Sequence, residues 1–539
     1  ADRSTSQAGT AAGRALGVDG LLTYTRRDGY ETRPKGYENF NPQEYFGNSV
    51  LGKFVYKPTG ADRLKLTTEA TQRNVRTELR NELSATVKDS RASDDTMRFR
   101  ATIEHEHAAP LAFIDKASWR FSYTKLERQE HQTQLRLTTG QMRNRVTDLT
   151  FEQDVYSGDV QLKSSLDTWG VKHALTYGAS LDHTSTSRPR DRTETNLVTG
   201  AQTKSFAGIP GAAPEIFPNK NFPDTRTVLA GAYVQDEVAI DRFNVVPGLR
   251  VDYYRMDPEP DGAFANTNSK NFQVSSVSDV AVSPKLGVTA KLLDGYSWFG
   301  QYARGFRAPP YDDANIGFTN ASQGYEILPN ANLKPETLDS FETGIRGKFR
   351  DGSSFSFTGF YNKYDNFIAS RQIGTSATGL LQFQSVNIES ATIYGTEAKG
   401  DWRFFPDFSL FGAFAFAHGE DDRTKQPIDN VAPMTLVGGL RYDNTALGFG
   451  AQLVATHAFR HERTTNPVNF KAPSYDLVDF GAWFELAPHF TINAGVRNLL
   501  DRKYFIAQDV VGLTSTNPSD INRLAQPGRN AYVNASVKW

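Results

Sequence analysis

The sequence predicts an all-β fold, an antiparallel transmembrane β-barrel, on two observations. The first is a strict alternation of apolar and polar residues, as in MRFRATIE at 97–104 and ASWRFSYT at 117–124. Charged residues at every second position of so many segments are typical of strands with lipid on one side and a wet lumen on the other. The second observation is that short and long connections alternate along the chain. This alternation predicts a sheet with tight turns at one end and long loops at the other.

The predicted connections fall into two sets. Short turns are expected near Gly60, Pro110, Asp167, Asp241, Gly295, Gly352, Pro406, Asn444 and Pro488. Long links are expected at 74–94, 127–150, 185–225, 256–278, 304–336, 369–388, 418–432, 458–474 and 505–528. Because outer-membrane barrels have short periplasmic turns and long extracellular loops, we assign the long links to the outside of the cell.

The alternation predicts about 21 strands, the first at residues 5–13 and the last at residues 531–539. Bacterial single-chain barrels normally have an even number of strands, and 22-stranded barrels are the plugged-transporter class. We therefore expect a 22-stranded barrel of which residues 1–539 form one domain. The missing first strand and any domain that fills so wide a lumen are expected before Ala1.

Composition removes several classes of function. The chain has 539 residues, a formal net charge of −1 and no cysteine, so it shows no nucleic-acid footprint and no possible disulfide or thiolate site. No segment approaches the roughly 20 consecutive apolar residues of a spanning helix. The motifs GxGxxG, GxxxxGK[ST], HExxH and GxSxG are absent, and we expect no enzymatic activity. His105 and His107 share one strand face at metal-chelating spacing, but a solvated strand end is the favoured interpretation.

One long connection, Tyr302–Glu336, is the strongest candidate for a binding site. Loops of this length inside a regular β array are usually functional or disordered. Arg304 and Arg307 stand at its entrance, where they could grip an anion or pair with lumen carboxylates. Tyr311 and Tyr325 are its possible iron ligands, since a phenolate is one of the protein groups that bind iron.

The environment of these tyrosines and of two further histidines leaves alternatives open. Tyr325 follows Gly324, which frees the backbone to present the ring, yet a packing or rim aromatic is the commoner role on such barrels. His457 and His461 flank another external loop and could meet a ligand over the barrel mouth. A solvated loop histidine is the default interpretation for both.

Several motifs taken together resemble the TonB-dependent outer-membrane receptors. They are VQDE at 234–237, SPKL at 283–286, FETGI at 341–345, YGTE at 394–397 and VRNLLDRKY at 496–504. Two further boxes, FRAP at 306–309 and PNANLKPE at 329–336, are similar to the paired boxes of the haem/haemoglobin receptor branch. The residues that carry this narrower resemblance are Phe306, Arg307, Ala308, Pro309, Pro329, Asn330, Asn332 and Leu333.

The resemblance implies a location, a ligand and partners for the protein. A member of this branch sits in the outer membrane of a Gram-negative bacterium as a monomer surrounded by lipid, binds haem or a haemoprotein, and binds TonB rather than nucleic acid. Haem is then a transported ligand and not a permanent cofactor. The plug domain and the TonB-contacting segment are expected before Ala1. Many members place an axial histidine between the two boxes; this chain has none there, and Tyr325 becomes the matching candidate for the haem iron.

The working hypothesis is therefore a receptor that captures haem and imports it with energy supplied through TonB. Arg304, Arg307, Tyr311 and His461 are its further candidate contacts. Within the same class, a ferric-siderophore receptor is the alternative. A passive porin is the alternative from a different class, and an outer-membrane hydrolase is a third, although no acidic pair or triad is recognisable.

Overall fold

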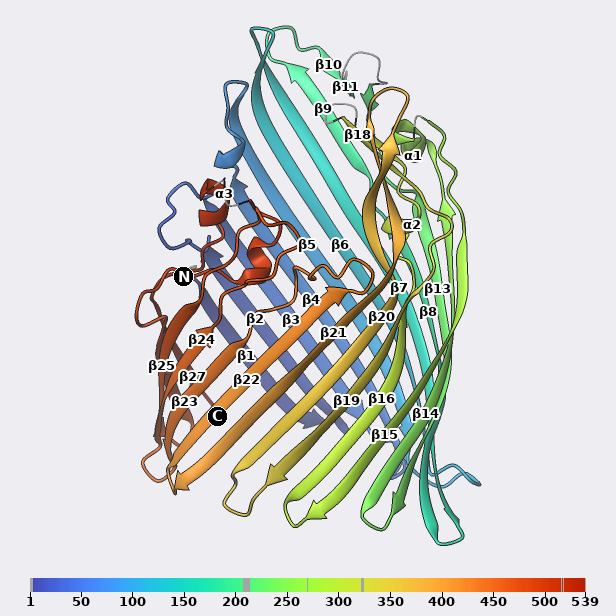
Figure 1. The fold of residues 1–539 in the computed structure, drawn as a ribbon, viewed down its shortest axis with the longest axis vertical. Coiled ribbons are helices and arrows are strands. Elements are labelled where there is room, and N and C mark those ends of the chain that lie inside the picture. Colours follow the sequence, from blue (N-terminus) through green and yellow to red (C-terminus); the bar gives the residue numbers. More distant parts are fainter. Residues whose placement is uncertain are drawn as a thin grey trace.

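The computed structural model describes residues 3–206, 214–268, 270–320, 324–514, 516 and 518–538. Its main element is one sheet of 25 strands that curves into a barrel (Figure 1). Four of these strands are short and belong to extracellular loops: β9 (Arg190–Asn196), β10 (Gln202–Thr203), β17 (Phe318–Asn320) and β18 (Tyr325–Leu328). The other 21 strands of the described chain form the wall, as the sequence predicted.

The wall strands pair antiparallel in chain order. They are β1 (Thr5–Ala15), β2 (Val18–Tyr30), β3 (Gln43–Tyr56), β4 (Asp62–Glu78), β5 (Val87–His107), β6 (Lys116–Thr138), β7 (Gln141–Thr168), β8 (Val171–Ser187), β13 (Asp224–Ile240), β14 (Phe243–Glu259), β15 (Val277–Leu293), β16 (Tyr296–Arg307), β19 (Glu336–Lys348), β20 (Ser354–Thr375), β21 (Leu381–Phe405), β22 (Phe408–Asp421), β23 (Thr435–Asn444), β24 (Phe449–Ala458), β25 (Tyr475–Ala487), β26 (Phe490–Arg497) and β27 (Asn530–Val537).

All nine predicted short turns are confirmed, and they lie at the lower end of the barrel in Figure 1. Two of the predicted long links, 127–150 and 369–388, are largely wrong. β6 and β7 continue to a two-residue turn at Thr139–Gly140, and β20 and β21 likewise extend into a tall hairpin. Beyond the membrane both faces of a strand meet water, so the apolar alternation disappears from the sequence although the backbone pairing continues.

The wall shows the two-sided character that the alternation predicted. Large apolar side chains, among them Leu410 and Phe416 of β22 and Leu440 of β23, are exposed on the outer face. On the opposite face, charged side chains such as Arg346 and Lys399 line a cavity inside the wall. This is the arrangement of a strand between lipid and a polar lumen.

The two edges of the sheet are β1 and β27. β1 pairs with β2 and β27 pairs with β26, and no ladder joins β1 to β27 within the described residues. Every side chain of β1 is exposed. Trp539, which ends the predicted last strand, lies outside the described residues.

The extracellular loops contain the few helical segments: η1 (Arg80–Glu82), α1 (Gly262–Thr267), α2 (Tyr311–Ala314), η2 (Ala507–Val510) and α3 (Pro518–Asn522). In the described part of the chain, none of the helices has the length and apolar character that a membrane span requires. The loop 185–225 also holds a small hairpin of β11 (Ser205–Phe206) and β12 (Glu215–Ile216).

Two apolar clusters hold these loops against the wall. The first consists of Tyr254, Met256, Val277, Ala314, Leu333 and Ile368. The second consists of Ala472, Phe505, Ala507, Val510, Ile521 and Ala525. The first cluster contains residues of the Tyr302–Glu336 connection, so it fixes the position of the predicted binding loop.

Candidate ligand-binding loop

The connection Tyr302–Glu336, called the motif loop below, is folded rather than extended. From the end of β16 the chain forms α2, then β17 and β18, and it enters β19 at Glu336. β18 pairs antiparallel with β17 and parallel with β21, with Tyr325 opposite Leu381. The motif loop therefore adds two strands beside the tall β20–β21 hairpin at the top of the barrel (Figure 1).

The FRAP box anchors the first half of the motif loop. Phe306 is the last but one residue of β16, paired with Thr337. Ala308 packs against the first apolar cluster. Pro309 is fully buried, and its carbonyl oxygen accepts a hydrogen bond from the Tyr254 hydroxyl at 3.0 Å. These contacts turn the chain from the wall onto the cluster.

The second box anchors the other half through backbone and amide hydrogen bonds. The Asn330 backbone N–H donates to the Ala314 carbonyl at 2.9 Å, and its side-chain amide donates to the Ser385 carbonyl at 2.8 Å. The Asn332 backbone N–H donates to the Asn330 side chain at 3.0 Å. Leu333 is buried in the same cluster that Ala308 contacts. The two boxes thus fix the two ends of the motif loop to the same apolar cluster.

Pro329 connects the second box to β21. Its carbonyl oxygen accepts a hydrogen bond from the Gln384 side chain at 2.8 Å. The side chain of Ser385 donates to Asp313 of α2 at 2.8 Å. Residues of the motif loop are therefore bound to two consecutive positions of the β20–β21 hairpin.

The structure places Arg304 and Arg307 on opposite faces of β16, because they are an odd number of residues apart in one strand. Arg307 Nη1 lies 3.2 Å from Glu336 Oε2, and the other oxygen of Glu336 accepts from the Ile368 backbone N–H at 2.7 Å. Arg304 lies 4.0 Å from Asp339. Of the two predicted alternatives, carboxylate pairing is the one observed, and the two side chains do not form one anion grip.

Tyr325 stands at the start of β18, after Gly324 with its positive φ of 75°. Its half-buried ring lies edge-on between Phe318 and Phe383, with centroid distances of 6.1 and 6.2 Å. Its hydroxyl oxygen is 3.4 Å from the side-chain nitrogen of Asn320. The ring is therefore held by aromatic packing, while its hydroxyl group lies beside Asn320 of β17. Gln323 lies outside the described residues.

Sequence reasoning missed Glu326, which is the neighbour of Tyr325 and is fully buried. Its carboxylate pairs with the Lys270 ammonium and accepts a hydrogen bond from the Gln382 side chain at 2.7 Å. A buried carboxylate is costly unless it is paired in this way. A charged residue in the otherwise apolar run Tyr-Glu-Ile-Leu of β18 was the available signal.

Tyr311 is a packing residue of α2. Its ring meets Phe222 at a centroid distance of 5.0 Å, and burial together with the Asp312 charge raises the pKa of its hydroxyl. Burial also raises the pKa of Asp312. A raised pKa favours the neutral phenol over the phenolate that iron binds, which argues against Tyr311 as an iron ligand.

The predicted histidines lie apart from this loop. His461 is 6% exposed, and its backbone N–H donates to Ala472 of the second cluster at 3.0 Å. Because it is buried, it is not the solvated loop histidine of the default interpretation, and burial lowers the pKa of its imidazole. His457 is 2.7 Å from Asp476.

At the opposite rim, His105 and His107 both contact one oxygen of Asp62, at 3.0 and 2.8 Å. The shared carboxylate orders the strand end that the sequence placed next to a tight turn. Across the described ranges, no group of three or more His, Asp or Glu side chains is placed to hold a metal ion.

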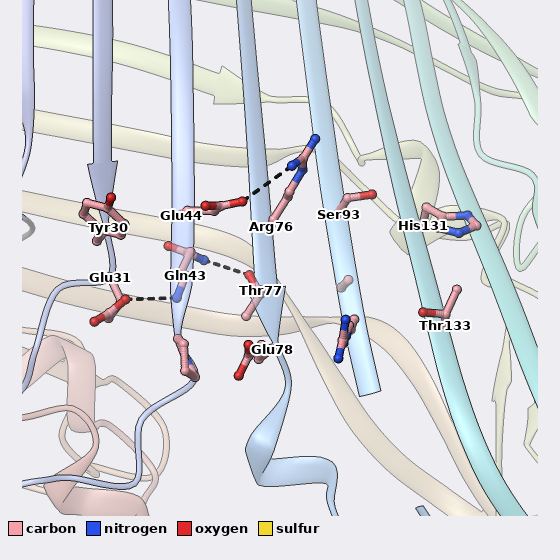
Figure 2. Close-up of a pocket in the computed structure, with 13 residues that line it drawn as sticks. Tyr30, Glu31, Gln43, Glu44, Arg76, Thr77, Glu78, Ser93, His131 and Thr133 are labelled. Atoms are coloured by element: carbon pink, nitrogen blue, oxygen red, sulfur yellow. Dashed lines mark hydrogen bonds and ion pairs between the residues drawn. The ribbon is translucent and has the colours of Figure 1, made fainter. Parts of the chain in front are cut away.

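A second cavity, of about 500 Å³, lies on the wall formed by β2 to β6, and Figure 2 shows the residues that line it. It contains Tyr30 and His131, two residue types that bind haem iron. These residues are four strands apart, which at the ordinary strand spacing is about 19 Å. The cavity cannot therefore bring both side chains to one iron atom. Exposed ion pairs such as Glu44–Arg76, at 3.5 Å, line the rest of it.

The fold and loops described so far define a large outer-membrane type of barrel with a folded extracellular cap. Residues 18–499 match the model of the family described as TonB dependent receptor-like, beta-barrel, and the chain belongs to that family. TonB-dependent receptor barrels are proteins of the Gram-negative outer membrane.

Three curated relatives show where the similarity lies. The chain is 30% identical over 296 residues to a protein named probable hemoglobin and hemoglobin-haptoglobin-binding protein 4 of Haemophilus influenzae, a match that covers 48% of this chain and 29% of that protein. It is 22% identical to the hemoglobin-haptoglobin utilization protein B of Neisseria meningitidis serogroup C, over 98% and 76% of the two chains. It is 24% identical to the hemin receptor of Yersinia pestis, over 64% and 48%.

Solved structures confirm the fold. The siderophore receptor PirA from Acinetobacter baumannii superposes with a TM-score of 0.72 at 17% identity, over 99% of this chain and 77% of that chain. The copper transporter OprC superposes with a TM-score of 0.71 at 14% identity, over 99% and 80%. The chain therefore spans less than a third of the Haemophilus relative but most of these solved barrels.

Proposed function

We propose that this chain is the barrel of a receptor that captures haem, free or carried by a haemoprotein, and imports it across the outer membrane with energy supplied through TonB. Family membership supports active transport over a passive pore. Relatives named as haemoglobin-binding proteins and as a hemin receptor support haem as the ligand. Haem is cargo in this proposal, and the protein acts as a lipid-embedded monomer that catalyses no bond chemistry.

The observation that carries the proposal to a particular residue is the construction of the motif loop. Both boxes are tied down, one by Pro309 and the other by Asn330 and Leu333. Between them the chain presents Tyr325 after a glycine with positive φ. A loop that is fixed at both ends and presents Tyr325 between them is suited to binding ferric haem. Tyrosine oxygen binds haem iron, and the surrounding packing fixes the direction from which the iron is approached.

Ferric-siderophore import is the alternative within the same family. A chelate whose iron is already saturated offers no open position to a tyrosine, so that function needs aromatic and cationic contacts but no iron ligand. The siderophore receptors among the solved structures share the fold at sequence identities that carry no information about the ligand.

The test is growth of an iron-starved Gram-negative host that lacks its own haem receptors and expresses the full-length protein. Haem as the only iron source is expected to support growth in the host with TonB and not in the same host without it. Growth on ferric siderophores but not on haem would contradict the ligand. Equal growth with and without TonB would contradict active transport and favour a pore.

A further inference from the structure

Five arginines gather on one face of the tall extracellular part of the wall. This arginine face consists of Arg136 of β6, Arg143 and Arg145 of β7, and Arg190 and Arg192 of β9. Pairing between strands brings them together: Arg136 lies opposite Arg143, and β9 folds back onto β7. The strands that carry them stand at the top of the barrel in Figure 1.

The strand register shows which way the arginine face points. Tyr156 and Val160, on the same strand as Arg143 and Arg145, are exposed on the outer, apolar face of the wall. Arg143 and Arg145 occupy odd positions of the strand and these two residues occupy even ones, so they point to opposite sides. The arginine face therefore looks toward the barrel axis, above the mouth through which a ligand enters.

Positive charge exceeds negative charge on this face. Glu194 pairs with Arg143 at 3.2 Å and Arg145 at 2.7 Å. Glu215 pairs with Arg190 and with Arg192, the latter at 3.3 Å. Two carboxylates thus serve four of the five guanidinium groups.

Arg136 has no carboxylate partner among the described residues. It donates to the Gln134 side chain at 2.8 Å, and Gln134 in turn donates to Glu82 of η1 at 2.8 Å. Like charges directly opposite each other, as Arg136 and Arg143 are, destabilise a sheet. Such an arrangement is expected where the positive charge serves to bind a ligand.

Several donors of this face are buried without a partner. The Nε atoms of Arg136, Arg143 and Arg190 are inaccessible to solvent and make no hydrogen bond within the described residues. An unsatisfied buried donor of a charged group costs more than a hydrogen bond contributes. Burial together with the neighbouring arginines lowers the pKa of Arg192 to about 10, and burial lowers that of Arg136.

Two aromatic rings hold the guanidinium groups in place. Phe206 lies 5.0 Å from Arg145 and 5.5 Å from Arg192, and Phe217 lies 5.0 Å from Arg190 and 4.8 Å from Arg192. Stacked guanidinium groups keep their planes fixed while their N–H edges remain able to donate.

We propose that the arginine face is an anion-binding site in the extracellular mouth, for a ligand that carries two or more carboxylate or phosphate groups. Guanidinium forks match the geometry of both oxyanions and bind them in bidentate fashion. The ligand's negative charge balances the excess of arginine, and its oxygens bind the guanidinium groups through the fraction of each side chain, 21–26% for the four paired arginines, that stays exposed.

The arginine face is also connected to the motif loop. Phe217, which stacks on Arg190, is followed by Asn221, whose carbonyl accepts from the Gly317 backbone N–H at 3.0 Å, and by Phe222, which packs on Tyr311. An anion held by the arginine face therefore lies against the same loop segment that supports the motif loop. The site does not require haem, since its chemistry is that of the oxyanion alone.

The test uses the purified full-length protein in detergent and two probes without iron. Tripolyphosphate represents phosphate ligands and is titrated by calorimetry. Metal-free protoporphyrin IX represents carboxylate ligands and is titrated by fluorescence, with its dimethyl ester as the uncharged control. We expect at least one probe to bind, and binding of the porphyrin but not of its ester identifies carboxylate as the source.

Two variants then test the site itself. Arg136→Gln and Arg192→Gln are each expected to weaken binding of that probe about tenfold, the loss of one charge-assisted hydrogen bond. Arg80→Gln is the matched control, because it removes one arginine from an extracellular loop where Glu78 pairs with it.

The outcomes that would overturn the proposal are equally definite. One is that neither probe binds the parent protein. The other is that both arginine variants bind like the parent or like Arg80→Gln. Arg136→Lys, which keeps the charge but loses the planar fork, is expected to bind between the parent and Arg136→Gln.

Discussion

The motif loop and the arginine face both stand at the extracellular end of the barrel, yet they are built in opposite ways. In the motif loop nearly every recognisable residue is buried or hydrogen-bonded, as Pro309, Asn330 and Leu333 are. On the arginine face, two carboxylates pair with four of the five arginines, and three buried Nε donors have no described partner. The two boxes of the motif loop therefore support its fold, whereas the excess positive charge of the arginine face lies outside any recognised motif.

The largest effect is expected from Leu333→Ala, which leaves a cavity in the cluster that joins the two boxes. Truncation of a buried leucine costs about 3 kcal/mol. We expect hydrogen exchange across the motif loop to accelerate on the order of 100-fold, the same free energy expressed as a rate of local opening. Leu83→Ala, at an exposed position, is the control. Equal exchange in both variants would show that the two boxes do not hold the motif loop in its folded position.

A smaller effect is expected from Tyr254→Phe. This change removes the donor to the buried Pro309 carbonyl and leaves that oxygen unsatisfied, at a cost of about 1–2 kcal/mol. Exchange in the motif loop is expected to accelerate on the order of tenfold. The neighbouring, exposed Tyr253→Phe is the comparison, and an equal response from the two tyrosines would contradict a specific role for the Tyr254 hydroxyl.

Glu194→Gln tests the charge imbalance by removing negative charge from the arginine face. The amide keeps the shape of the side chain but removes one of the two carboxylates, so the arginine face becomes more positive. Binding of the anionic probe is expected to tighten, by up to about tenfold, whereas the arginine variants weaken it. Weaker binding after Glu194→Gln, in a protein whose loop exchange is unchanged, would mean that net charge does not control this site.

The smallest effect concerns pH and the second apolar cluster. Burial lowers the folded-state pKa of His461 below the ordinary value of about 6.5. The neutral form is thus favoured by folding, so its stabilising contribution is complete above pH 6.5 and is lost as pH falls through the folded pKa. Protection of the amides at 459–474, that is the intrinsic exchange rate relative to their measured rate at the same pH, is expected to fall between pH 7.5 and 5. His461→Gln is expected to remove this fall, and a fall of the same size in that variant would assign it to another group.

The sequence predicts some levels of this structure better than others. Strand number and the nine tight turns were predictable because alternation is a local property with a period of two residues. The tall β6–β7 hairpin was missed, since residues 127–134 are all polar and carry no apolar face although they pair continuously. Arg304 and Arg307 seemed to act together because they are near in sequence, but the pleat of β16 separates them.

The arginine face was not predictable for a related reason. Its members come from three strands and meet only because β9 folds back on β7, a pairing that no local pattern encodes. Glu326 shows the same limit on a smaller scale, since its partners Lys270 and Gln382 come from two other segments of the chain. Tyr325 was identified from the chemistry of iron ligands and its place between the boxes, and its role stays a prediction.

The most direct measurement of the central claim is the absorption spectrum of ferric haem titrated into the full-length protein and into its Tyr325→Phe variant. Phenylalanine preserves the packing on Phe318 and Phe383 and removes only the hydroxyl. If Tyr325 ligates the iron, the parent shows a tyrosinate-ligated spectrum that the variant lacks, and affinity falls by tenfold or more. An identical spectrum and affinity in the two proteins would contradict it.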